Sequence, residues 1–291
     1  MKKTLFVILL MTACLSSIFC AKAKSKTSDF TSAMFKNALP GIETSMDKEQ
    51  IYQKGNVDGT DFSFTINLSK WNKNTSVEQI VTLSKLFWQC YPAMYKRFGE
   101  IMFSPEDITL AIEDEGYEVA WELENFVHLH DKWLKDNPED FDCLTHEFAH
   151  AIQNNWLDNF LEYDGYIERF ADYCRYIYAF DDGYYNDSGW TLWTPKDEST
   201  RETSVRFLVW LDTFYSTAEN DIILRYANVS RNGHFDREDW DKAWRRIFKG
   251  SALEGKTIDE VWALFTESDF AWIPSYSEQG KKSKLRAMLK R

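Results

Sequence analysis

The chain has 291 residues, of which 44% are hydrophobic and 16% aromatic, and its formal net charge is -12. A chain of this length and apolar content can bury a full core, as one large domain or two small ones. The acidic balance argues against nucleic acid as a partner, because proteins that bind nucleic acids present basic surfaces.

Residues 1–23 have the pattern of an export signal peptide. Lys2 and Lys3 precede an apolar run that is too short to span a bilayer, and Ala-Lys-Ala at 21–23 offers a cleavage site. Met-Thr-Ala-Cys at 11–14 also resembles a bacterial lipobox, in which Cys14 would be acylated. We therefore expect an exported chain, secreted or periplasmic. Anchoring by a lipid at the cell surface stays open and is the only membrane contact expected.

The stretch after the signal is expected to lead into the folded domain without regular structure of its own. Residues 24–60 are polar and are predicted to form an extended lead-in to a domain over 61–270. Ser76 is placed to cap an amphipathic helix that reaches Phe98. Alternation and β-branched content predict strands, and these lie within 62–68, 108–112 and 119–130.

Residues 146–150 read His-Glu-Phe-Ala-His within a stretch expected to be helical. Residues four apart share one face of a helix, so His146 and His150 can reach a single metal ion. Glu147 then leans over the open side of that ion, the arrangement in which two histidines hold Zn²⁺ and the glutamate takes a proton from its water. The alternative interpretation is an ordinary helix that carries two histidines.

The next predicted helix supplies two acids at the same spacing. Glu168 follows His150 by enough residues for a loop and a return helix, and we predict it as the third ligand. Two histidines and one glutamate with an open position are typical of catalytic rather than structural zinc. Asp172, one turn later, is expected to accept the other ring N–H of His146, which would orient that ligand. A solvated helix face is the alternative for both acids.

The helix that carries the two histidines is expected to begin at Asn137, with Pro138 in its first turn, and to end near Trp156. The metzincin pattern is excluded, because Gln153 and Trp156 stand where that class has glycine and a third histidine. The site is therefore gluzincin-like. A strand before the helix is expected to offer a peptide its free edge, and 125–130 is the candidate.

Four motifs resemble those of the basic secretory protein family, over roughly residues 85–268. The resemblance implies a zinc-dependent peptidase of the gluzincin type, and it carries roles only to His146, Glu147, His150 and Glu168. The chain departs from the family in being acidic, and in having Arg201 where plant members have a tyrosine. The matching motifs are LTHExxHxxQ at 144–153, GxIExxADYxR at 165–175, VRFLxW at 205–210 and GKTxDxxW at 255–262.

These observations predict an exported zinc metallopeptidase with one Zn²⁺ per chain and a peptide or protein substrate, a glycoprotein being one alternative. Two other functions stay open: a zinc amide hydrolase of non-peptide substrates, and a non-catalytic protein that binds glycans or proteins at the surface. The donor that would stabilise the oxyanion is not fixed. Its candidates are Arg201, Tyr166 and His234.

The predicted fold is α+β and zincin-like. A small N-terminal sheet with helices is expected to face a helical C-terminal part across the zinc cleft, with a basic tail over 271–291. Cys90, Cys143 and Cys174 are expected to be buried free thiols, with a bridge between the last two as the alternative. C-terminal helices are predicted at 201–215, 219–228, 237–248 and 258–266.

Overall fold

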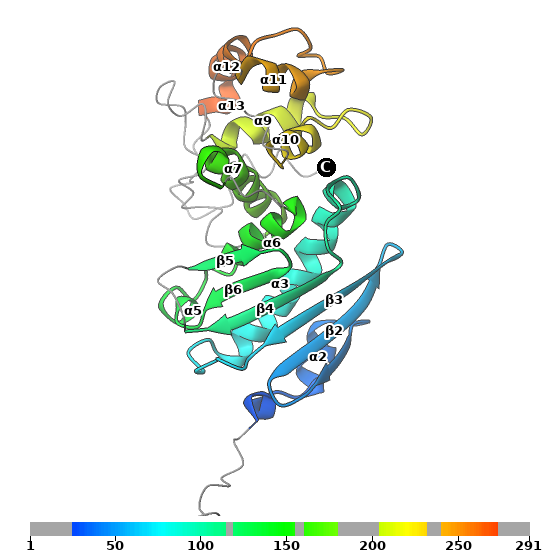
Figure 1. Ribbon diagram of the computed structural model, residues 1–291, viewed down its shortest axis with the longest axis vertical. Helices are drawn as coiled ribbons and strands as arrows, with labels where there is room; N and C mark the ends of the chain where they lie inside the picture. Colours follow the sequence, from blue (N-terminus) through cyan, green and yellow to red (C-terminus); the bar gives the residue numbers. More distant parts are fainter. Residues whose placement is uncertain (1–24, 115–118, 155–159, 180–203, 232–239, 273–291) are drawn as a thin grey trace, which may run out of the picture.

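The computed structural model describes residues 25–114, 119–154, 160–179, 204–231 and 240–272. It has the mixed α+β architecture that the sequence predicts, with a six-stranded sheet in the N-terminal part and helices in the C-terminal part (Figure 1). The predicted export signal, Cys14 and all but two residues of the predicted tail lie outside the described ranges. Among the described residues, no helix is both long and apolar enough to cross a bilayer.

The sheet has the strand order β1-β2-β3-β4-β6-β5. Its two central pairs, β3 with β4 and β4 with β6, are parallel, and the outer pairs are antiparallel. Positive φ angles at Asp58 and Gly59 close the tight turn between β2 and β3. The strands are β1 (Glu43–Met46), β2 (Gln50–Val57), β3 (Thr60–Asn67), β4 (Asp107–Glu113), β5 (Ala120–Leu123) and β6 (Phe126–His130).

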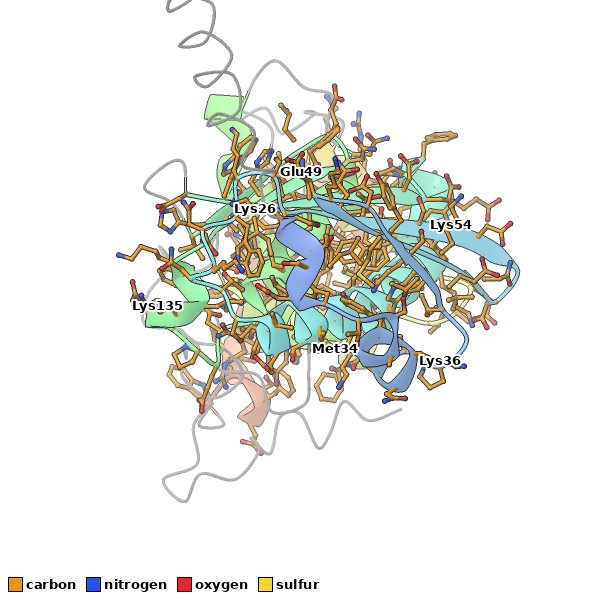
Figure 2. The ribbon with its side chains drawn as sticks, turned by 90° about the horizontal axis from the view of Figure 1, so that it is seen from below. Lys26, Met34, Lys36, Glu49, Lys54 and Lys135 are labelled. Atoms are coloured by element: carbon orange, nitrogen blue, oxygen red, sulfur yellow. The ribbon has the colours of Figure 1, made fainter. Side chains whose placement is uncertain are left out.

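The prediction of an extended lead-in over 24–60 is wrong about where the fold begins. Residues 43–57 form β1 and β2, and Ile51 of β2 is fully buried opposite Ile66 of β3. β1 has only four residues, and β2 alternates its two buried residues with polar ones, so composition alone hides both strands. Before them come η1 (Lys26–Asp29) and α2 (Ser32–Ala38), and α2 lies at the lower end of the molecule in Figure 1. Seen from below, Lys54 and Lys135 lie on opposite sides of the molecule (Figure 2).

The crossover from β3 to β4 is the predicted amphipathic helix. In α3 (Val77–Met94), Ser76 accepts a hydrogen bond from the Gln79 N–H, and the Gln79 side chain accepts from the Ser76 N–H. The helix continues through a π-helical turn, η2 (Tyr95–Gly99), into the short α4 (Glu100–Met102). The predicted amphipathic character is confirmed, since the apolar residues along one side of the helix are fully buried: Leu83, Phe87, Cys90, Met94 and Phe98.

The predicted free edge is misplaced by one strand. β6 lies inside the sheet between β4 and β5, and the edge is β5. The reason is the tight turn at Glu124, whose φ of 61° folds β5 back antiparallel to β6, while β6 itself pairs parallel to β4. Among the described residues, no strand pairs with the outer side of β5.

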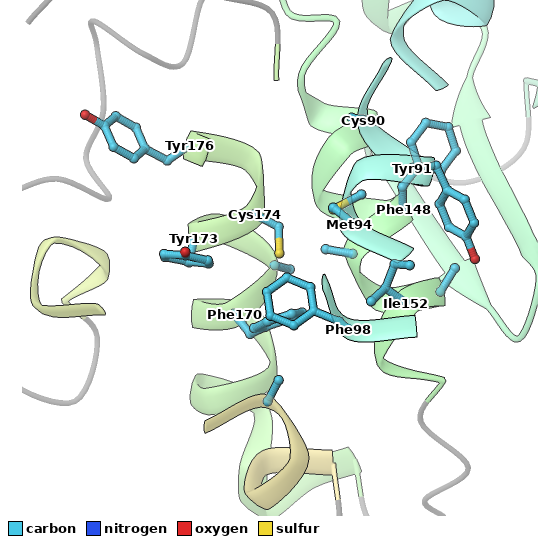
Figure 3. Packing of buried hydrophobic residues seen from close by; sticks show 14 of the residues in the cluster. Cys90, Tyr91, Met94, Phe98, Phe148, Ile152, Phe170, Tyr173, Cys174 and Tyr176 are labelled. Carbon is cyan, nitrogen blue, oxygen red and sulfur yellow. The ribbon is translucent and has the colours of Figure 1, made fainter. Parts of the chain in front are cut away.

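The helices α6 (Cys143–Gln153) and α7 (Phe160–Tyr178) join the sheet to the C-terminal helices (Figure 1). Phe98 of η2 meets Phe170 of α7 with ring centroids 5.1 Å apart, and Figure 3 shows Cys174 beside them. The three cysteines of the folded part are buried and free, as predicted. The remaining helices are α5 (Trp133–Asp136), α9 (Val205–Tyr215), α10 (Ile222–Arg231), α11 (Trp240–Phe248), α12 (Ile258–Glu267) and α13 (Asp269–Trp272).

One charged network fastens the two parts together. Arg97 of η2 donates from Nε to Asp221 Oδ2 and from Nη2 to Asp212 Oδ1, both at 2.6 Å. It also donates to the Tyr173 hydroxyl on α7 at 2.8 Å. Because Asp212 lies on α9 and Asp221 precedes α10, a single guanidinium holds three C-terminal helices against the end of α3. This arrangement fixes α7 relative to the sheet.

Candidate metal centre

The two histidines project from the side of α6 that faces away from the core. Leu144, Phe148 and Ile152 are fully buried and anchor the opposite side of the helix. The side chains of His146 and His150 are 16% and 14% exposed. α6 is thus an amphipathic helix whose apolar face fixes its rotation, and the rotation presents both imidazoles to α7.

The acids on α7 meet these imidazoles directly. The distance from His146 Nε2 to Glu168 Oε2 is 3.0 Å, and that from His150 Nε2 to Glu168 Oε1 is 3.4 Å. The two Nε2 atoms are 3.1 Å apart. Among the described residues, this is the one group of three or more potential ligands whose donor atoms converge, with one atom of each within 4.8 Å of the others.

These distances fit a tetrahedral ion. Ligand atoms about 2.0–2.1 Å from a zinc ion lie about 3.3 Å from one another in tetrahedral geometry. Two imidazole nitrogens cannot both face each other as acceptors unless a proton or a cation lies between them. The 3.1 Å approach of His146 and His150 therefore needs either a proton or a cation between the two nitrogens, and a metal ion is one way to meet that need.

Each histidine has an oxygen partner on its other nitrogen. His146 Nδ1 lies 2.9 Å from Asp172 Oδ1, the contact that the spacing on α7 predicts, and Asp172 is 5% exposed. His150 Nδ1 lies 3.3 Å from Oε1 of Gln153, which is fully buried one turn further along α6. Such partners fix the ring so that Nε2 keeps its lone pair for a metal. The sequence analysis missed this role of Gln153, although the i, i+3 spacing from His150 signals it.

The electrostatics of the cluster favour positive charge. Burial lowers the pKa of His146, but its hydrogen bonds to Asp172 and Glu168 outweigh burial and raise the pKa to about 10. Burial raises the pKa of Glu168, but its hydrogen bonds to His146 and His150 outweigh this and hold that pKa far below its usual value. The same carboxylates that stabilise an imidazolium would stabilise a divalent cation.

The comparisons with known proteins find no match. This holds for models of protein families, for curated proteins and for solved structures. The interpretation of the site therefore depends on its residues and geometry.

Of the three candidates for an oxyanion donor, Arg201 and His234 lie outside the described residues. Tyr166 lies two positions before Glu168 and so points to another side of α7. Its ring packs against Tyr226 of α10, with centroids 5.8 Å apart, and it is 5% exposed. The structure does not bring Tyr166 to the ligand atoms.

The predicted start of the histidine-bearing helix is wrong. α6 begins at Cys143 rather than at Asn137, and Asp142 precedes it without a side-chain cap. Asp140 and Asp142 instead accept hydrogen bonds from Arg175 of α7, and Asp140 accepts another from the Trp133 indole. Asp140, which local sequence rules place in a first helical turn, is thus used together with Asp142 to fasten α6 to α7. The helix ends at Gln153, and Trp156 lies outside the described residues.

Two further histidines, on β6, have acid partners of their own. His128 Nδ1 lies 2.6 Å from Glu113 Oε1, and His130 Nε2 lies 3.3 Å from Asp114 Oδ1. The two pairs do not converge into a group of three ligands, so in the described part of the chain they form no second metal cluster.

Proposed function

We propose that the chain is a zinc-dependent peptidase of the gluzincin type, built on a zincin-like fold. The observation that carries the proposal is the triangle of His146 Nε2, His150 Nε2 and a Glu168 oxygen, with sides of 3.0 to 3.4 Å. The motif resemblance to the basic secretory protein family supports the same activity. The pattern in residues 1–23 supports an exported enzyme, with lipid anchoring through Cys14 as the alternative to free secretion.

His146, His150 and Glu168 would hold the ion, and Asp172 and Gln153 would orient the two imidazoles. When bound, zinc supplies a water of lowered pKa, about 7, and a Lewis acid for the developing oxyanion. Glu147 follows His146 directly on α6 and is the residue that would act as the general base. Its carboxylate would accept a proton from the attacking water and deliver it to the nitrogen that leaves.

A peptide substrate would add to the sheet at β5. The register Ala120 with Leu129 to Leu123 with Phe126 uses only one side of β5 for pairing with β6. The backbone groups on the other side can accept an extended peptide as a further strand. α6 packs over β5 and β6 (Figure 1). A peptide added to β5 would therefore pass beside the helix that carries His146, Glu147 and His150.

The test combines metal content with peptide cleavage. Purified wild type and Glu168→Ala are supplied with zinc, analysed for zinc per chain, and assayed with a fluorogenic peptide library. Glu267→Ala, an acid at the exposed end of α12, is the matched control. We expect one zinc per chain and cleavage in the wild type and the control, and loss of both in Glu168→Ala.

Three other outcomes separate the alternatives. A wild type that holds zinc and cleaves small acyl amides but no peptide would indicate a different amide hydrolase. Ligand capture that survives chelation, without turnover, would indicate a binding protein. A wild type without zinc would contradict the proposal outright.

A further inference from the structure

An acidic side chain occupies an apolar position on the edge strand. Across the sheet, Glu122 of β5 pairs with Val127, Val127 with Leu110, and Leu110 with Ile66. The last three are fully buried beneath the helices. Since cross-strand partners project from the same face of a sheet, Glu122 projects toward the face that α6 covers.

The neighbours of Glu122 are unfavourable to its charge. Burial raises the pKa of Glu122 to about 8, and the carboxylates of Glu147 and Glu124 add to the rise. No cation of the described residues acts on it in this way, and among the described side chains Glu122 forms neither an ion pair nor a hydrogen bond. Glu122 is therefore a partly buried carboxyl whose charge nothing in the described part of the chain balances.

A partner from outside the chain would balance it. A partly desolvated carboxylate next to another gains most from a cation, because both burial and repulsion oppose its ionisation otherwise. Glu122 does not belong to a group of three potential ligands among the described residues, so a second metal ion is not the natural partner. A peptide added to β5 would pass beside Glu122, and a cationic group of that peptide would supply the positive charge.

We propose that Glu122 is a specificity-determining residue that selects peptides carrying a cationic nitrogen next to the scissile bond. The nitrogen is either that of a lysine or arginine side chain or that of a free terminal amine. This inference rests on the proposed peptidase function.

The other face of β5 sharpens the expected substrate. Trp121 and Leu123 flank Glu122 and point to the opposite side of the sheet, where they are 39% and 56% exposed. Trp121 is held in place by stacking on His128, with ring centroids 3.6 Å apart. An extended substrate alternates its side chains in the same way, so a residue next to the cationic one would meet an apolar surface.

The test compares matched peptides on the zinc-loaded enzyme. One N-acetylated fluorogenic peptide carries a single lysine, a second carries norleucine there, and a third carries norleucine but a free terminal amine. We expect wild type to favour at least one cationic peptide over the N-acetylated norleucine peptide by about tenfold in kcat/KM, equivalent to one favourable charge contact. The preferred arm identifies which nitrogen is recognised.

Three variants assign the preference to Glu122. Glu122→Gln should lose it while still cleaving the neutral peptide, and Glu122→Lys should favour a glutamate-containing peptide instead. Glu124→Gln removes the same charge from the adjacent turn and should keep the wild-type preference. Fluorescence anisotropy of the same peptides on chelated protein measures the preference without turnover, and it should follow the same order.

Equal cleavage of cationic and neutral peptides by wild type would overturn the inference and leave the peptidase function standing. A preference that persists in Glu122→Gln would overturn it as well. If zinc-loaded wild type cleaves no peptide in any arm, the proposed function fails and the inference fails with it. The anisotropy measurement then reports separately whether Glu122 binds cations at all.

Discussion

Two pairs of carboxyls lie near the histidines of α6, and they differ in whether a contact with a described side chain balances their negative charge. Glu168 and Asp172 on α7 both contact His146, at 3.0 and 2.9 Å, and the pKa of Glu168 is held low. Glu122 on β5 and Glu147 on α6 have no hydrogen-bonded or ion-paired partner among the described residues, and the pKa of Glu122 is raised to about 8. The first pair marks where the proposed resident cation would be held. The second faces the side on which substrate would arrive.

The largest effect on activity is expected from a change in the second pair, Glu122 and Glu147. Glu147→Gln keeps the shape of the side chain but cannot accept a proton, so kcat should fall by about 10²- to 10⁴-fold while one zinc per chain remains bound. Steady-state peptide cleavage and metal analysis check both parts. Glu139→Gln, which alters an exposed acid before α6, is the control and should be unaffected. Unchanged turnover in Glu147→Gln would remove Glu147 from the mechanism.

A smaller effect, on zinc affinity, is expected from a change in the pair that contacts His146, Glu168 and Asp172. Asp172→Asn weakens the hold on His146 Nδ1, and the loss of such an orienting carboxylate typically costs about 10- to 100-fold in metal affinity. Competition with a zinc chelator measures this change. Gln153→Met acts through the longer 3.3 Å contact to His150 and should cost less. An Asp172→Asn variant with wild-type affinity would show that this contact does not orient the ligand.

The contacts of Glu168 and Asp172 with His146 also lead us to predict that zinc binding depends on pH. Since the pKa of His146 is raised to about 10, the metal-free site holds a proton there at neutral pH, and a zinc ion must displace it. Affinity should therefore rise with pH below 10, by up to about tenfold per unit for one proton. Isothermal titration calorimetry in two buffers of different ionisation enthalpy counts the protons released. Zinc binding without proton release would contradict the charge balance described for this pair.

The smallest expected effect is on the stability of the folded chain. Its change with pH has opposite signs for Glu122, whose pKa is raised, and for Glu168, whose pKa is lowered. Because folding raises the pKa of Glu122 from 4.5 to about 8, the stability present below pH 4.5 is lost as the pH rises toward 8. Glu122→Gln cannot ionise and keeps that stability. In chelated protein, its Tm should equal or exceed that of wild type, and the difference should grow between pH 5 and pH 9. A difference that shrinks over this range would mean that Glu122 is compensated in the folded chain.

The sequence predicts those features that local rules determine. The cap of α3 needs only Ser76 and Gln79, and the positions of His146, His150, Glu168 and Asp172 follow from helical periodicity. Contacts between residues that are distant in the chain cannot be predicted from such local rules. Local rules assign Asp140 to the start of a helix, but in the structure Asp140 and Asp142 accept hydrogen bonds from Arg175, which lies more than thirty residues away.

Strand order is the other feature that the sequence leaves open. Which of two neighbouring strands becomes the edge depends on how the hairpin at Glu124 pairs with β4, and alternation of residue types does not encode this. The importance of Glu122 depends on the same fact. Its acid looks like an ordinary exposed residue until the register places it beneath α6 beside Glu147. The candidate site was therefore predictable for its ligands and not for the surface that a substrate would meet.

The central claim is that His146, His150 and Glu168 hold a catalytic zinc ion. Zinc X-ray absorption spectroscopy of purified wild type tests it most directly. The account predicts a first shell of nitrogen and oxygen at about 2.0–2.1 Å, with the outer-shell scattering of two imidazoles, and loss of this spectrum in Glu168→Ala. A first shell containing sulfur at about 2.3 Å, or a spectrum unchanged by Glu168→Ala, would contradict it.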